Sequence, residues 1–108
     1  MPRKFRVEIT PSAERDVRSI QAFIARDKKK AAAPWVREFT RQVRSLESMP
    51  LRYEVIPEAP DLGVEYRHII FGNYRTIYRV QENRVIILRV IHAARLLDQA
   101  LFQNLPPP

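Results

Sequence analysis

The sequence contains no cysteine, only two glycines and one tryptophan, and no long apolar run. The absence of cysteine excludes disulfides, a thiol nucleophile, zinc ribbons and iron–sulfur ligation. No apolar stretch approaches the ~18 residues that span a bilayer, and the first residues lack the apolar stretch of a signal peptide. We therefore expect a protein that is neither membrane-inserted nor secreted by that route, and a cytoplasmic location agrees with the missing cysteines.

Several enzyme motifs are missing as well. The chain has no glycine-rich phosphate loop, no dinucleotide-binding GxGxxG, no zinc-binding HExxH and no serine-hydrolase GxSxG. Its two histidines, His68 and His92, are expected about 16 Å apart on a sheet, which is too far for one metal ion. We expect no metal, no cofactor and no small-molecule substrate.

Basic residues outnumber acidic ones by nineteen to twelve, a formal net charge of +7. Most of the basic residues are arginine, which suits forked contacts with phosphate and carboxylate. Such a balance favours a polyanionic partner: nucleic acid, an acidic protein or an anionic lipid. A basic coat that merely keeps the protein in solution is the plainer interpretation.

The 108 residues predict one domain, with a core at about 4–102 and a frayed tail at 103–108. Alternating apolar residues indicate a strand at 4–10, and Thr10-Pro11 supplies the cap and first turn of a helix that ends near Asp27. A second amphipathic helix begins at 30–33 and stops before Pro50. A proline-bearing loop, with an extended piece at 53–56, follows to Gly63.

From Glu65 onward the apolar period changes to two. Three strands at 66–71, 74–80 and 85–92 are joined by Gly72-Asn73 and Glu82-Asn83, which are typical two-residue hairpin turns. A weak helical pattern covers 93–102. The expected fold is α+β: an N-terminal strand, an antiparallel two-helix hairpin, then a three-stranded antiparallel meander with a short C-terminal helix.

With regular turns, counting along the strands assigns each residue to a sheet face. One face holds Tyr66, His68, Ile70, Arg75, Ile77, Arg79, Ile86, Leu88, Val90 and His92. The other holds Arg67, Ile69, Phe71, Tyr74, Thr76, Tyr78, Val85, Ile87, Arg89 and Ile91. The hairpin can cover only one face, so we expect the uncovered one to present aromatics and arginines; which face that is stays open.

The residues that carry chemistry in this sheet are cationic or aromatic. They are Arg67, His68, Tyr74, Arg75, Tyr78, Arg79, Arg89, His92 and Arg95. Such groups can bind phosphates, transfer protons without a metal, or dock an acidic peptide. Strand arginines that only solvate an exposed sheet face are the alternative.

The stretch 65–80 and its continuation through 82–95 resemble the C-terminal sheet of the RelE/ParE toxins. The most specific pieces are Tyr74-Arg75, Tyr78-Arg79-Val80 and the ending Val90-Ile-His-Ala-Ala-Arg95. The earlier strand, helix hairpin and loop match the same order, so the resemblance covers about residues 4–102. It implies a bacterial type II toxin–antitoxin or plasmid-stabilisation module, in which an acidic ParD-like antitoxin neutralises a small basic toxin.

The RelE/ParE family has two branches with different targets, and the branch decides whether this protein is expected to be an enzyme. RelE-like members are ribosome-dependent, metal-independent mRNA endonucleases, and Arg67, Arg75, His92 and Arg95 are the catalytic candidates for that case. Ile69 lies where a second lysine is expected, however, and Leu101 and Phe102 lie where a tyrosine is expected. The His92-Ala-Ala-Arg95 ending resembles instead the ParE branch, which inhibits DNA gyrase. We favour the ParE-like interpretation.

The same resemblance implies a surface that binds the antitoxin or the target. The residues expected on it are Arg67, Arg75, Tyr78, Arg79, Arg89 and Arg95. A nucleic-acid-binding module without toxicity is a further alternative, which charge and strand aromatics support.

Overall fold

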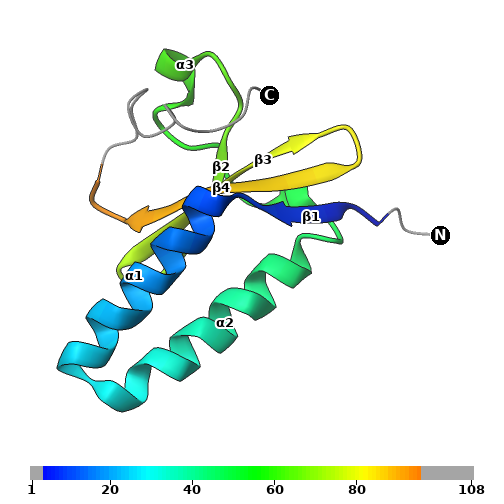
Figure 1. Cartoon of the computed structure of the whole chain (residues 1–108). Coiled ribbons are helices and arrows are strands. Elements are labelled where there is room, and N and C mark those ends of the chain that lie inside the picture. The colour runs from blue at the N-terminus through cyan, green and yellow to red at the C-terminus, as the bar shows by residue number, and fades with distance from the viewer. Residues whose placement is uncertain (1–3, 96–108) are drawn as a thin grey trace.

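The computed structural model describes residues 4–95 and has the expected α+β architecture (Figure 1). The elements are β1 Arg6–Ile9, α1 Pro11–Asp27, η1 Lys29–Ala31, α2 Ala32–Ser45, η2 Pro50–Arg52, α3 Ala59–Leu62, β2 Arg67–Phe71, β3 Tyr74–Gln81 and β4 Arg84–His92. The predicted strand, helix hairpin and three-stranded meander are confirmed. The sequence did not predict η2 or α3 within the loop. The C-terminal helix predicted at 93–102 lies mostly outside the described residues, and the tail at 103–108 lies outside them entirely.

The start of α1 is fixed by Thr10. Its Oγ1 accepts a hydrogen bond from the Ala13 N–H at 3.1 Å and donates one to the Leu88 carbonyl at 3.0 Å. Pro11 occupies the first helical position, where no backbone N–H is needed. The cap therefore also ties the helix to β4, at the point where β1 ends. No helix within residues 4–95 is long and apolar enough to cross a membrane.

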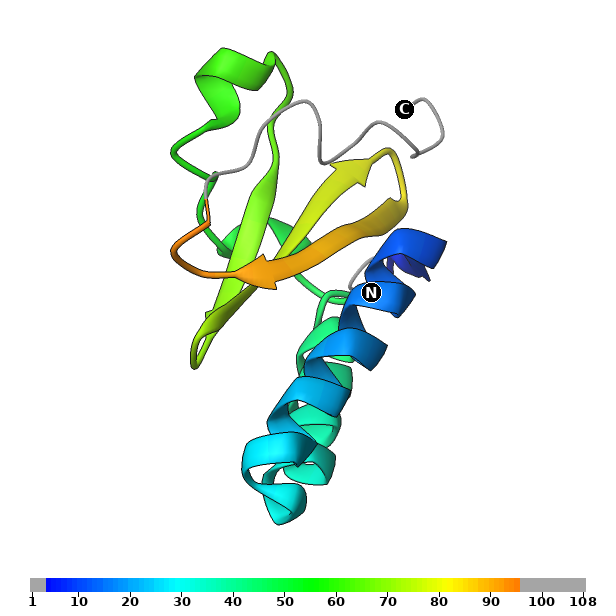
Figure 2. The ribbon, with the colours of Figure 1, turned by 60° about the vertical axis from the view of Figure 1, so that its left-hand side comes forward.

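The second helix begins at Ala32, with Pro34 in its first turn as predicted. Its apolar residues pack against those of α1 and against one face of the sheet. The buried cluster formed in this way contains Ala13, Ile20, Phe39, Val43, Leu46, Ile69, Tyr78, Val85, Ile87 and Val90. The far end of the hairpin, around residues 27–31, projects beyond the sheet in both views (Figures 1 and 2).

The sheet has the strand order β1-β4-β3-β2. Strand β1 pairs parallel to β4, with Val7 opposite Val85, while the other pairs are antiparallel. The pairs Phe71–Tyr74 and Val80–Val85 confirm the predicted register at both turns. Positive φ angles at Gly72 and Glu82 close these turns.

A β-bulge in β4 overturns part of the predicted face assignment. Ile77 pairs with Arg89, whereas the next residue, Tyr78, pairs with Ile87, so Leu88 is the extra residue. Residues 89–92 are therefore turned over relative to a regular strand. Val90 and His92 join the helix-covered face, and Arg89 and Ile91 leave it. Nothing in the alternation of β4 marks the bulge, because both faces of this strand are apolar.

The second face of the sheet is covered in part, although we expected it to be open. After Val55 pairs with Arg67 beside β2, the loop that includes α3 lies on the side of the sheet opposite the helix hairpin (Figure 1). A second apolar cluster forms there from Ile56, Ala59, Ile77 and Ile91, with Leu62 and Tyr66 packed against it. The loop follows this course because its few apolar residues find partners on that face.

Candidate functional site

Arg75 is the second residue of β3, lies on the second face and is 4 % exposed. Its guanidinium forms an ion pair with Glu58, in which Glu58 Oε1 accepts from Nη1 at 3.2 Å. Nη2 also donates to the Arg95 carbonyl at 2.6 Å. Only Nε lacks a hydrogen-bond partner. The most specific arginine of the sequence pattern is therefore surrounded by groups of its own chain.

His68 is held beside Arg75 and is 5 % exposed. Arg75 Nη1 lies 3.2 Å from His68 Nδ1, and Glu54 Oε1 lies 2.9 Å from Nε2. A guanidinium can only donate, so Nδ1 accepts and the ring proton is on Nε2, where it meets the Glu54 carboxylate. These contacts fix the orientation of the ring. Both of its nitrogens are occupied.

The acidic partners in this network come from one stretch of sequence. Residues 53–66 contain Glu54, Glu58, Asp61 and Glu65 and no basic residue. Glu54 and Glu58 contact His68 and Arg75, and Glu65 pairs with Arg67. These carboxylates were not among the predicted site residues. The signal that points to them in the sequence is an all-acidic loop in a chain of net charge +7.

Arg67 lies on the opposite face from Arg75. Its Nη1 donates to the carbonyls of Tyr53, at 2.6 Å, and Leu51, at 3.2 Å. Nη2 lies 2.5 Å from the Glu65 carboxylate. These contacts hold the segment after α2 against the start of β2. Arg67 does not meet Arg75 or His68, so the structure does not bring these candidates together.

Tyr78 is fully buried in the main apolar cluster. Its hydroxyl donates to the Pro50 carbonyl at 2.5 Å. Burial raises the pKa of Tyr78 to about 12, against an ordinary value of 10.0. In this conformation Tyr78 supports the core, and its predicted contact with a partner stays a prediction.

Arg89 pairs with Asp16 of α1 through two hydrogen bonds of 2.7 and 2.9 Å. Asp16 Oδ2 also accepts the Val90 N–H at 2.9 Å, which the neighbouring strand does not reach because β1 has ended. The hydrogen bond to Asp16 raises the pKa of Arg89. The pair joins the hairpin to the open edge of β4.

His92 ends β4 on the helix-covered side, away from His68. Its ring packs edge-on against Tyr74 at 5.9 Å, and Tyr74 packs edge-on against Trp35 at 5.7 Å. His92 Nδ1 accepts the Ala94 N–H at 3.1 Å, and its carbonyl accepts the Arg95 N–H at 3.0 Å. The side chain itself is exposed. His92 is thus the accessible histidine, on the other side of the sheet from Arg75.

Arg79 is half-buried, and its Nε has no hydrogen-bond partner. It lies two residues beyond Ile77 on β3, on the same face as Arg75. The second face therefore combines Arg75, Arg79 and His68, and Arg75 already binds the Glu58 carboxylate there. Within residues 4–95 no three His, Asp or Glu side chains are grouped so that they could hold a metal ion.

Comparisons with known proteins agree with this fold. A family model described as the ParE toxin of the type II toxin–antitoxin system parDE matches residues 7–97. No curated protein matches the chain. A chromosomal ParDE system from P. aeruginosa has a chain with a TM-score of 0.66 and 16 % identity, covering 83 % of this chain and 97 % of that chain.

A second solved structure, the toxin–antitoxin complex RelBE2 from Mycobacterium tuberculosis, contains a chain with a TM-score of 0.56 and 26 % identity. That match covers 85 % of this chain and 94 % of that chain. The family match spans most of the sequence, from β1 to beyond β4. The chain therefore belongs to the ParE family and is the toxin component of a type II toxin–antitoxin system.

Proposed function

We propose that this toxin inhibits DNA gyrase and that an acidic ParD-like antitoxin neutralises it. The observation that carries the proposal is that Arg75 is buried and paired within its own chain. A nuclease would need this arginine free to contact a scissile phosphate, yet it is 4 % exposed and bound to Glu58, His68 and the Arg95 carbonyl. These contacts suit a toxin that acts by binding its target.

The side chains near Arg75 that could transfer protons also favour a gyrase inhibitor over a nuclease. His68 has both nitrogens occupied, and Tyr78 is buried with a pKa of about 12. Arginines bind phosphates but are poor general bases at neutral pH. Metal-free RNA cleavage depends on positioned acids and bases, each contributing about 10²–10⁴-fold. Among residues 4–95, the Arg75 neighbourhood offers no such group without a hydrogen-bond partner.

The antitoxin proposal rests on charge. The chain carries +7, and Arg79 has a buried Nε without a hydrogen-bond partner on a face that already binds carboxylates from residues 53–66. The solved relatives were determined as toxin–antitoxin systems. An acidic antitoxin segment that reaches Arg79 and the neighbouring face would extend the pairing that Glu54 and Glu58 begin.

Purified protein tests the target directly. Added to gyrase and relaxed plasmid, it is expected to block supercoiling and to leave broken DNA, while purified antitoxin restores supercoiling. Induced in bacteria, it is expected to stop DNA replication and leave mRNA intact. Normal supercoiling by gyrase, together with cleavage of mRNA on added ribosomes, would contradict the proposal.

A ribosome-dependent mRNA nuclease is the second candidate, and His92 is the observation in its favour. This histidine is exposed, and histidine is the side chain suited to proton transfer near neutral pH. The likeness to the RelBE2 complex agrees with this candidate. Cleavage of ribosome-bound mRNA that is lost in His92→Ala but kept in His68→Gln would establish it.

A further inference from the structure

The solvent side of α2 carries a line of basic side chains. Arg37, Arg41 and Arg44 follow one another at spacings of four and three residues, which places them on one helix face. Lys30 continues the line in η1, seven residues before Arg37. All four are exposed, and the apolar face of α2 with Phe39 and Val43 points the other way, into the core.

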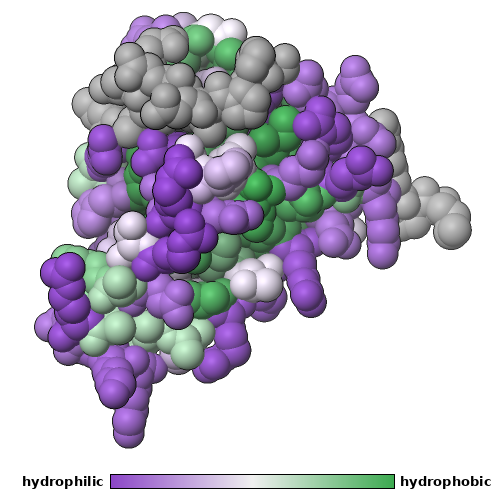
Figure 3. All heavy atoms as spheres, in the orientation of Figure 1, coloured by the Kyte–Doolittle hydropathy of each residue, from purple (hydrophilic) through white to green (hydrophobic). Residues whose placement is uncertain are grey.

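The line is straight and long enough to follow a polymer. At about 1.5 Å per residue, Arg37 and Arg44 are about 10 Å apart along the axis and Lys30 extends the line to about 21 Å. Duplex DNA carries one phosphate per about 3.4 Å of each strand, so the line spans about six phosphates. In Figure 3, hydrophilic side chains project from the hairpin at the lower left of the view.

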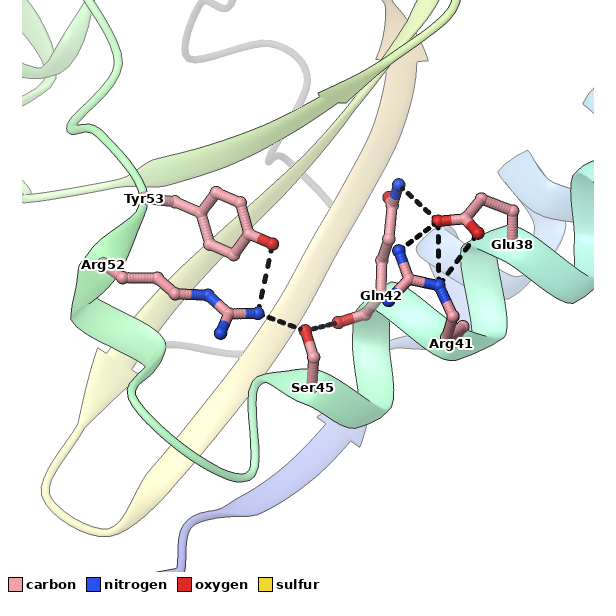
Figure 4. A network of polar contacts seen from close by, with 6 residues as sticks. All are labelled: Glu38, Arg41, Gln42, Ser45, Arg52 and Tyr53. Atoms are coloured by element: carbon pink, nitrogen blue, oxygen red, sulfur yellow. Dashed lines mark hydrogen bonds and ion pairs between the residues drawn. The ribbon is translucent and has the colours of Figure 1, made fainter.

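A polar network at the base of this face orders Arg41 and, beyond Arg44, Arg52 (Figure 4). Arg41 Nε donates to Glu38 Oε1 at 2.9 Å, and Nη2 donates to Glu38 Oε2 at 2.5 Å. Arg52 Nη2 donates to Ser45 Oγ at 2.9 Å, and its guanidinium lies 5.0 Å from the Tyr53 ring centre. Arg52 in η2 is thereby held at the end of α2, as a further cation beyond Arg44.

The charge of the chain is divided between two regions. Residues 26–52 contain eight basic and three acidic residues, whereas residues 53–66 contain four acidic and no basic ones. Within the acidic stretch, Glu54 and Glu58 pair with His68 and Arg75 on the side of the sheet away from the hairpin. The outer face of α2 is therefore left positive, with Arg41 alone paired by Glu38.

We propose that this face, formed by Lys30, Arg37, Arg41, Arg44 and Arg52, binds the phosphate backbone of duplex DNA. The solvent-facing positions of α2 carry Ala33, Pro34 and Thr40 between the cations and no aromatic residue. Recognition of single-stranded nucleic acid relies on aromatic stacking, whereas backbone contact with a duplex needs only cations at a regular spacing. The role of this DNA binding in the cell rests on the proposed function, since a gyrase inhibitor meets its target on DNA.

Binding of a 20-base-pair duplex of arbitrary sequence to the full chain, measured by fluorescence anisotropy between 50 and 200 mM salt, tests the proposal. Arg37→Gln/Arg44→Gln is expected to lower affinity about 10–100-fold and to reduce the slope of log K against log salt by about 2. The matched control is Arg15→Gln/Arg18→Gln, which removes the same charge from exposed positions on α1. Thermal unfolding checks that both variants fold.

Equal losses in the two double variants would overturn the assignment, because overall charge alone would then explain binding. Tighter binding of single-stranded RNA of the same length would also overturn it. So would a loss of affinity for the acidic antitoxin in Arg37→Gln/Arg44→Gln while duplex binding is unchanged. The measurement contains no gyrase, so a toxin that binds duplex through this face but leaves gyrase active would contradict only the proposed function.

Discussion

Arg75 of β3 and Glu58, the residue preceding α3, form an ion pair, and both side chains are largely buried, at 5 % and 12 % exposure. The pair anchors the acidic segment 53–66 to the second face of the sheet. It also fills the space in which Arg75 would otherwise meet a ligand. The position of this segment thus decides what the central arginine can do.

Removing the acidic partner is expected to destabilise the fold strongly. In Glu58→Gln the Arg75 charge stays buried without its counter-ion, which costs about 3–5 kcal/mol of unfolding free energy. Urea unfolding measures the change. Glu65→Gln is the control, since Glu65 is 66 % exposed in its pair with Arg67 and such pairs contribute about 1 kcal/mol or less. Similar losses in both variants would contradict a structural role for the Glu58 pair.

Tyr78 is expected to make the fold sensitive to alkaline pH. Its folded pKa of about 12 exceeds the ordinary 10.0, so the unfolded chain ionises first as pH rises. This contribution to stability is complete below pH 10 and is lost progressively toward pH 12. Tyr78→Phe removes that pH dependence, while Tyr74→Phe on the same strand keeps it.

The same variant is expected to weaken the fold at neutral pH. Without the hydroxyl, the Pro50 carbonyl loses a buried hydrogen bond, at a cost of about 1–3 kcal/mol. Urea unfolding at pH 7 and at pH 11 measures both effects. A Tyr78→Phe variant that matches the wild type at each pH would show that the buried hydroxyl contributes nothing.

Arg79 is expected to contact the antitoxin. A charge-assisted hydrogen bond contributes about 1.5–3 kcal/mol, so Arg79→Ala should raise the Kd of the complex about 10–100-fold. Isothermal titration of the purified antitoxin measures the change, and Arg18→Ala on the exposed side of α1 is the control. An unchanged Kd for Arg79→Ala would place the interface elsewhere.

The local elements follow from the sequence because each depends on neighbouring residues. Thr10-Pro11 specifies a helix start by supplying one hydroxyl and omitting one N–H. Gly72 and Asn73 specify a tight turn because glycine adopts positive φ without strain. The alternation of apolar residues specifies the strands on either side. The resemblance to the ParE toxins rests on specific residues in those strands, above all Tyr74-Arg75 and Tyr78-Arg79-Val80.

The tertiary structure alone decided which side chains meet. The bulge at Leu88 reverses residues 89–92, so His92 lies on the face of Tyr74 and not on the face of His68. No local pattern marks the bulge because β4 is apolar on both faces. The pairing of β1 with β4 joins residues nearly eighty positions apart, for which sequence periodicity has no signal. Arg75 is buried because the acidic loop folds back over the sheet. Opposite charges make a pair between Arg75 and an acidic loop residue favourable. Only the folded backbone, however, brings Glu58 within reach of Arg75.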